Sequence, residues 1–168
     1  MNITKISLLA LSALSLSAAS VQAADYISVN GGYYDALRKD QKAGQFGAEY
    51  RLSPIKYGLS PIAGAFVTTK GAGYGYAGLD WALALMSNEL YLVPNFAVGA
   101  YGKGNGKDLG GVLEFRSGIE LDYQFKNSQQ IGVALNHLSN AGIYSHNPGE
   151  ETIMATYSIP VGTLFGGR

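Results

Sequence analysis

One short stretch of the chain brings together residue types that can hydrolyse an ester. His137 and Ser139 are two residues apart, and they share the parity of the apolar residues Ile131, Val133 and Leu135. Because alternate side chains of a β-strand point to the same side, an imidazole and a hydroxyl extend an otherwise apolar row. A serine hydroxyl is a poor nucleophile until a base removes its proton, and histidine is suited to that task near neutral pH.

An acidic residue occupies the same face of the following predicted strand. Glu151 shares the parity of Ile153 and of the other apolar residues that follow it. If residues 129–139 and 151–160 pair as a hairpin, Glu151 converges with the imidazole and can orient it, as the acidic member of a triad does. Glu150 is the competing acid, but its parity turns it to the opposite face. The structural alternative is a set of polar side chains that ends a hydrophobic band at a membrane interface.

The ends of the chain differ from its middle in composition. Residues 1–23 contain one lysine followed by an apolar run that only serines interrupt, which predicts a secretory signal peptide. Its removal leaves residues 24–168, enough for one predicted domain, which the composition and strand pattern indicate to be an outer-membrane β-barrel. The chain has no cysteine, so disulfides cannot hold that domain together. Outer-membrane barrels commonly end in an aromatic residue, so either Phe165 acts as the terminal strand residue and the final three residues are a tail, or the assembly signal is unusual.

The composition is typical of a membrane barrel. The 168 residues include 23 glycines and 12 tyrosines, and only 14% are charged. No segment after residue 23 has the roughly 18 consecutive apolar residues of a membrane helix, so strands must do any spanning. Twelve basic and twelve acidic residues cancel, so the balance does not favour a nucleic-acid partner.

Alternation of apolar and polar residues predicts an all-β fold: an eight-stranded antiparallel transmembrane β-barrel with short periplasmic turns and longer external loops. Pro61 calls for a bulge or an unpaired position in the third strand. This topology puts the end that carries His137 and Glu151 outside, at the leaflet built from lipopolysaccharide. The predicted strands cover residues 26–33, 46–52, 57–68, 74–85, 90–100, 113–125, 129–139 and 151–160.

The residues 137–142, His-Leu-Ser-Asn-Ala-Gly, with Asn147, Gly149 and Glu151, resemble the signature of the PagL family of outer-membrane lipid A 3-O-deacylases. The signal peptide, the length and the strand pattern extend this similarity over the mature chain. The resemblance implies a carboxylic ester hydrolase in which Ser139 is the nucleophile, His137 the base and Glu151 the acid of a Ser/His/Glu triad. The enzyme would remove the ester-linked acyl chain at the 3-position of lipid A with no metal or other cofactor.

The resemblance also implies an oxyanion hole. Asn140 falls where the family motif has an asparagine, and Gly142 would allow close approach of the chain, while Asn147 is a second candidate donor. Basic residues of the predicted external loops can attract the phosphates of lipopolysaccharide, although a simple solvated-loop role is equally open. These residues are Arg38, Lys39, Lys42, Lys70, Lys103 and Lys107.

The predicted partner is lipid A, or lipopolysaccharide, in the outer membrane of a Gram-negative bacterium, where the barrel would lie as a multi-pass protein. A non-catalytic structural or adhesive barrel is the main alternative function. A third hypothesis is a soluble periplasmic barrel that binds a lipid in its interior. The sequence leaves open the acyl-chain preference, the lining of an acyl groove and the oligomeric state, a homodimer included.

Overall fold

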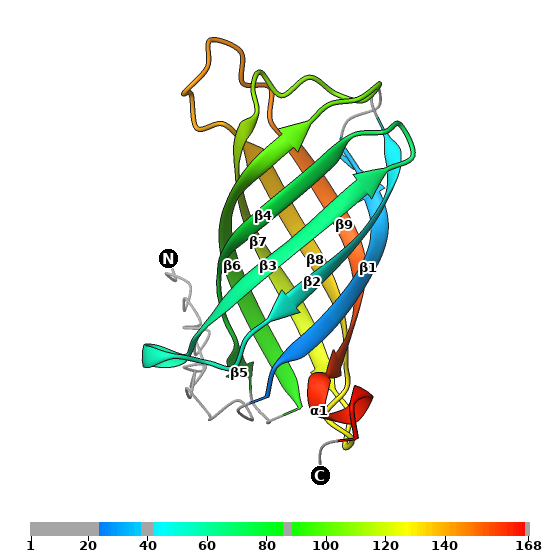
Figure 1. Cartoon of the computed structure of the whole chain (residues 1–168), viewed down its shortest axis with the longest axis vertical. Helices are drawn as coiled ribbons and strands as arrows, with labels where there is room; N and C mark the ends of the chain where they lie inside the picture. The colour runs from blue at the N-terminus through cyan, green and yellow to red at the C-terminus, as the bar shows by residue number, and fades with distance from the viewer. Residues whose placement is uncertain (1–23, 38–41, 86–88, 167–168) are drawn as a thin grey trace, which may run out of the picture.

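The computed structural model describes residues 24–37, 42–85 and 89–166, and it is a closed barrel with tilted walls (Figure 1). The predicted signal peptide lies outside the described residues. The labelled elements are β1 (Tyr26–Tyr34), β2 (Ala43–Arg51), η1 (Lys56–Gly58), β3 (Leu59–Thr68), β4 (Gly73–Trp81), β5 (Leu83–Leu85), β6 (Leu90–Gly102), β7 (Leu113–Gln124), β8 (Gln130–Ser139), β9 (Glu150–Pro160) and α1 (Val161–Leu164).

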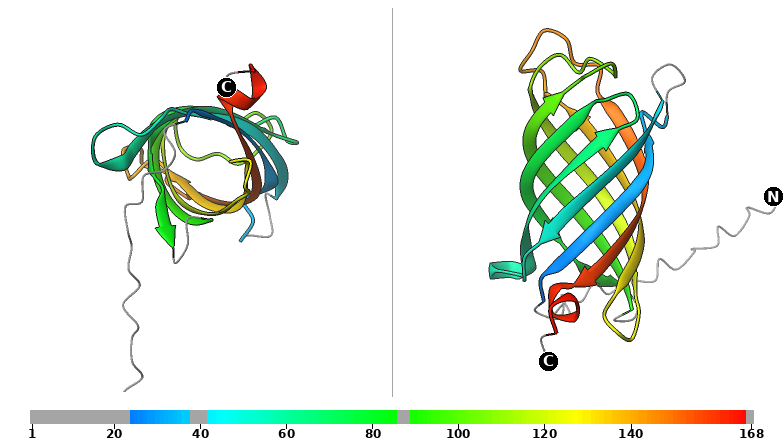
Figure 2. Two further views of the ribbon diagram at one scale, coloured as in Figure 1. Left: turned by 90° about the horizontal axis from the view of Figure 1, so that it is seen from below. Right: turned by 45° about the vertical axis from the view of Figure 1, so that its right-hand side comes forward.

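The sheet is antiparallel throughout its described ladders, and it closes on itself. Its strand order is β4-β3-β2-β1-β9-β8-β7-β6-β5, and β4 also pairs with β6, which joins the two ends of the order. β4 and β5 pair with successive parts of β6, so together they act as one strand of the barrel. The predicted eight-stranded barrel is therefore confirmed, and its ring shape is visible along the axis (Figure 2).

The two faces of the wall differ as the alternation predicted. In β8 the side chains of Ile131, Val133 and Leu135 are exposed, whereas Ala134 and Asn136, which have the opposite parity, are buried. The same division holds along β9, whose residues pair with β8 in continuous register from one end to the other. The apolar row that carries His137 thus faces outward.

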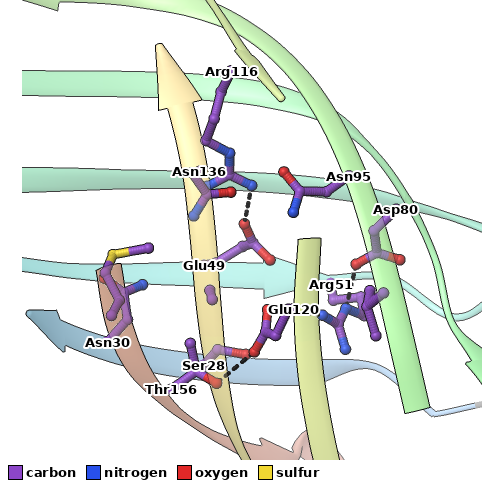
Figure 3. A pocket seen from close by; sticks show the side chains of 13 residues that line it. Ser28, Asn30, Glu49, Arg51, Asp80, Asn95, Arg116, Glu120, Asn136 and Thr156 are labelled. Atoms are coloured by element: carbon purple, nitrogen blue, oxygen red, sulfur yellow. Dashed lines mark hydrogen bonds and ion pairs between the residues drawn. The ribbon is translucent and has the colours of Figure 1, made fainter. Parts of the chain in front are cut away.

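Charged pairs fill the interior of the barrel (Figure 3). Arg116 of β7 bonds Glu49 of β2 at 2.9 Å, and Arg51 of β2 pairs with Asp80 of β4. These pairs join charges from different strands, because side chains converge across the narrow lumen. The cavity among them encloses only about 20 Å³, room for about one water. A cavity of this size cannot hold a lipid, which argues against the hypothesis of a barrel that binds a lipid in its interior.

Pro61 lies in a regular β3–β4 ladder, and of the two predicted alternatives, a bulge or an unpaired position, the structure has the unpaired position. It lies opposite Leu79 in the β3–β4 register, and its carbonyl accepts a hydrogen bond from Leu52 N–H at 2.9 Å. A strand residue directs its own N–H and C=O to the same side, and the β2–β3 register ends at Arg51 and Ile62. Proline has no N–H, and the position at which residue 61 would donate lies just past the end of the β2–β3 ladder. The strand begins at Leu59 rather than at Tyr57, which has a φ of 64°.

The C-terminal end also departs from one of the two predicted alternatives. The last strand stops at Pro160, and Val161 N–H donates to Asp25 C=O at 2.9 Å as the chain turns into α1. Phe165 follows that helical turn and is 78% exposed, so it is not the terminal strand residue. Across residues 24–37, 42–85 and 89–166, no helix is long and apolar enough to cross a membrane.

The connections 103–112 and 140–149 lie at the end of the barrel opposite α1 (Figure 1). The turn 125–129 lies at the α1 end, together with the turn 52–58, which projects sideways (Figure 2). β8 runs toward the end of the barrel that carries the connections 103–112 and 140–149, and β9 runs back from it. His137, Ser139 and Glu151 therefore all lie near this loop end.

Candidate active site on the outer wall

His137 and Glu151 are direct partners in the β8–β9 ladder. The distance from His137 Nδ1 to Glu151 Oε1 is 3.4 Å, and the side chains are 45% and 22% exposed. Both project from the outward face, so the predicted convergence across the hairpin is present in the structure. The carboxylate approaches Nδ1, which leaves Nε2 as the imidazole nitrogen that can serve a nucleophile.

The neighbouring Glu150 occupies the opposite face, as its parity indicated. Its side chain is fully buried, and its Oε2 accepts a hydrogen bond from the backbone N–H of Asp35 at 3.3 Å. It therefore contributes to the interior of the barrel and does not reach the outward pair.

Ser139 is the last residue of β8, half-buried, and it lies opposite Phe115 of β7. It projects from the same face as His137, roughly 6.5–7 Å away along the strand. In the described part of the chain, Ser139 Oγ makes no hydrogen bond to His137. A catalytic hydrogen bond is often long in the absence of substrate, and a rotation of both side chains can close this separation.

The loop after β8 is organised by Asn140, whose side chain is fully buried. Its Nδ2 donates to Leu109 C=O at 2.8 Å and to His146 C=O at 2.9 Å, while its Oδ1 accepts from Gly142 N–H at 3.0 Å. The Asn140 backbone N–H donates to Asn147 Oδ1 at 3.2 Å. Asn140 therefore holds the connections 103–112 and 140–149 together, and both of its amide hydrogens already have acceptors.

The three oxyanion candidates differ in whether their donor groups are already hydrogen-bonded within the loop. The side-chain amide of Asn140 and the backbone N–H of Gly142 are both engaged within the loop. Asn147 is exposed, and the contact with Asn140 N–H fixes its Oδ1, so its Nδ2 is directed elsewhere. A sequence motif cannot reveal this difference, because it depends on which carbonyls the folded loop brings to Asn140.

Two glycines of the loop have different roles. Gly142 has a φ of 79°, and an added Cβ would meet no protein atom within 4 Å, so within the protein it is the backbone conformation that favours glycine. Gly149 has a φ of 60°, and an added Cβ would lie 2.8 Å from His137 Cε1 and 3.3 Å from Nε2. The Gly149 backbone thus packs against the imidazole. The motif contained this glycine, but only the structure shows what it touches.

An apolar groove begins beside the polar pair. Leu135 and Ile153 form the next outward rung of the β8–β9 ladder after His137 and Glu151. They line a depression of about 270 Å³ on the outer wall. Its remaining apolar lining comes from Leu92, Ile119, Leu121, Val133 and Ala134.

The basic residues of the loops fall into distinct environments. Lys42 is exposed and Lys70 is half-buried. Lys103 is also exposed and bonds Asp108 at 2.7 Å, and this bond, with one from Gly110 N–H, holds the pKa of Asp108 below its ordinary value. Arg38 and Lys39 lie outside the described residues.

Lys107 lies in neither of the two environments that the sequence left open, a solvated loop or a surface that attracts phosphates. It is only 9% exposed, and its Nζ bonds Asp35 Oδ1 at 2.6 Å. Leu109 beside it is buried as well, because this part of the loop folds over the mouth of the barrel. Lys107 is therefore occupied by an internal ion pair and is not presented to a phosphate.

Comparisons with known proteins agree with this architecture. The family model described as lipid A 3-O-deacylase (PagL) matches residues 30–160. The lipid A deacylase PagL of Pseudomonas aeruginosa is 38% identical over 55 residues, which are 33% of this chain and 32% of that protein. The match thus spans about a third of the curated relative. A solved structure, the crystal structure of the outer membrane enzyme PagL, superposes with a TM-score of 0.67 at 22% identity, covering 81% of this chain and 99% of that one, and supports the fold.

Proposed function

The chain belongs to the family of PagL lipid A 3-O-deacylases, and from this premise we propose that it is an outer-membrane serine esterase acting on the 3-position of lipid A. The observation that carries the proposal is the contact between His137 and Glu151 on the outward face. Ionisable side chains on a lipid-facing wall are costly, so such a pair marks a functional site. An amphipathic lipid ester is a substrate that reaches this face from the membrane.

The proposed reaction follows the logic of a serine triad. His137 Nε2 takes the proton of Ser139 Oγ as that oxygen attacks the ester carbonyl carbon, while Glu151 stabilises the imidazolium through Nδ1. The tetrahedral intermediate collapses, the carbon–oxygen bond to the sugar breaks, and His137 returns the proton to the leaving sugar hydroxyl. A water molecule, deprotonated by His137, then hydrolyses the acyl-Ser139 ester and releases the fatty acid.

The developing negative charge on the carbonyl oxygen needs a donor. Asn147 is the proposed side-chain donor because both amide hydrogens of Asn140 already bond loop carbonyls. The bond from Asn140 N–H to Asn147 Oδ1 fixes the Asn147 amide, which makes its Nδ2 a preorganised donor. Asn140 then supports the oxyanion hole indirectly, by holding the loop that carries Asn147.

The apolar groove is the proposed site of the acyl chain. It starts at Leu135 and Ile153, next to the polar pair, and it continues along β7 and β8 on the outer wall. An acyl chain lying there remains in contact with the membrane hydrocarbon, so it can leave after hydrolysis without crossing water.

The loop end of the barrel is proposed to lie in the outer leaflet, after removal of residues 1–23 as a signal peptide. Of the six basic residues predicted in the external loops, Lys42, Lys70 and Lys103 are the described ones that can bind phosphate groups of lipopolysaccharide. Lys103 would leave its ion pair with Asp108 to do so. Point charges of this kind raise the local concentration of substrate without defining its orientation.

The test is incubation of the folded, purified protein with lipopolysaccharide, followed by mass spectrometry of lipid A and of released fatty acids. The proposal predicts loss of one hydroxyacyl chain with wild type and none with Ser139→Ala. Ser145→Ala, which removes an exposed hydroxyl from the same loop, is the matched control and retains activity. Intact lipid A with all three proteins would instead support the non-catalytic barrel.

A further inference from the structure

One position of β7 interrupts a row of large side chains on the lipid-facing wall. Ser117 is exposed, and it lies between Phe115 and Ile119 in the outward row. The other outward residues of β7 are Leu113, Leu121 and Tyr123. Ser117 is therefore the one small, polar side chain among the outward positions of this strand, Leu113–Gln124.

The register places Ser117 directly opposite His137. Side chains that face each other in an antiparallel ladder have Cβ atoms about 4.5–5.5 Å apart. Glu151 occupies the opposite flank of the imidazole, on β9, so His137 lies between a carboxylate and a second hydroxyl. Ser139 lies one outward position further along β8, opposite Phe115.

The fold gives Ser117 no internal use for its hydroxyl. In the described part of the chain its Oγ makes no hydrogen bond, and its β6 partner in the register, Phe96, offers no side-chain acceptor. A hydroxyl that faces hydrocarbon without a partner is unfavourable, whereas alanine would fill the same space without that penalty. A ligand on the outer wall can satisfy this hydroxyl.

The position of the groove relative to Ser139 determines which part of a bound acyl chain lies beside Ser117. Ile119 and Leu135, which line the groove, form the rung that follows Ser117 and His137. A chain whose carbonyl carbon is held at Ser139 must cross the rung of Ser117 before it enters the groove. Because the proposed reaction brings Ser139 Oγ toward His137, the ester carbonyl lies near the rung of His137 and Ser117, and the first carbons after it come within reach of the Ser117 hydroxyl.

We propose that Ser117 is a specificity-determining residue that hydrogen-bonds the hydroxyl of a 3-hydroxyacyl chain. This inference rests on the proposed function. The chain hydroxyl is on the second carbon beyond the carbonyl, and both hydroxyls can donate and accept. Removing one neutral hydrogen bond of this kind lowers the rate constant for the hydroxylated ester roughly three- to tenfold.

The test compares two glucosamine 3-O-esters that differ only in the chain hydroxyl, 3-hydroxytetradecanoyl and tetradecanoyl. Wild type prefers the hydroxylated ester by about three- to tenfold in kcat/KM. In Ser117→Ala that preference falls to about one, because hydrolysis of the hydroxylated ester slows while the plain ester is unaffected. Ser117→Thr keeps the hydroxyl and restores the preference.

Binding of the same two esters to Ser139→Ala separates this inference from the proposed function. Turnover by wild type with no preference between the esters, or an equal loss on both esters in Ser117→Ala, overturns the role of Ser117. A third outcome is that no ester is hydrolysed, but Ser139→Ala binds the hydroxylated ester more tightly and the double variant Ser117→Ala/Ser139→Ala does not. This outcome overturns the proposed function and retains the recognition site. Absence of both overturns both.

Discussion

Glu151 Oε1 lies 3.4 Å from His137 Nδ1 across the β8–β9 ladder, on the face of the barrel that carries its apolar side chains. The adjacent Glu150 points into the interior and bonds Asp35. Two consecutive carboxylates thus serve opposite sides of one wall. This arrangement follows from the two-residue period of a strand, and it allows a site on the lipid-facing surface to coexist with a charged lumen.

Glu151→Gln is expected to lower kcat on lipopolysaccharide by a factor on the order of 10²–10⁴, because the imidazole loses the charge that stabilises its protonated form. KM should change little, since the carboxylate does not contact the acyl chain. Glu150→Gln is the matched control, with kcat of the folded protein unchanged. Equal effects of the two substitutions in a fatty-acid release assay would contradict the role of Glu151.

Asn147→Ala is expected to lower kcat by roughly 10²–10³, the effect of losing one oxyanion donor, and to lower stability only by about 0.5–1.5 kcal/mol, because it removes one hydrogen bond from Asn140 N–H. Asn140→Ala should act differently, because it removes the bonds to Leu109 and His146 and leaves those carbonyls without their donor. Limited proteolysis should then cut the loop 140–149 in Asn140→Ala but not in Asn147→Ala. Full activity of Asn147→Ala would exclude it as the donor.

Gly149→Ala is expected to impair catalysis by displacing the imidazole, since the new Cβ would lie 2.8 Å from His137 Cε1. Gly142→Ala introduces comparable backbone strain at a φ of 79° but meets no neighbouring atom. The comparison of kcat between the two variants isolates the contact from the strain. We expect Gly142→Ala to remain much the more active, and similar losses in both would refute a positioning role for Gly149.

Lys107→Ala is expected to destabilise the barrel by about 3–5 kcal/mol, because it leaves the buried Asp35 carboxylate without its partner. Lys103→Ala removes an exposed pair with Asp108 and should change the free energy of unfolding by less than about 1 kcal/mol. Urea unfolding in lipid vesicles measures both values. Identical stabilities of the two variants would show that the Lys107–Asp35 pair does not hold this end of the barrel.

The parity of side chains along each strand was the most predictable feature of the molecule. The outward direction of His137 and Glu151, the inward direction of Glu150 and the eight-stranded closure all follow from alternation and turn spacing. These properties are local in sequence, so one chain is enough to predict them.

Features that depend on contacts between distant segments were not predictable. The burial of Lys107 was not predictable because its partner, Asp35, lies 72 residues earlier in the chain. The bonds of the Asn140 amide to Leu109 and His146 also depend on how the folded loops meet, so the sequence could not show them. The position of Ser117 beside His137 likewise depends on the register of β7 against β8, which alternation alone does not fix.

The most direct test of the account is to identify the residue that reacts with a fluorophosphonate, a probe that esterifies activated serines. The folded protein would be labelled in detergent and digested, and the modified peptide sequenced by mass spectrometry. The account predicts label on Ser139, strongly reduced in His137→Asn and absent in Ser139→Ala. Label on Ser117 or Ser145, or no label on protein that hydrolyses lipid A, would contradict it.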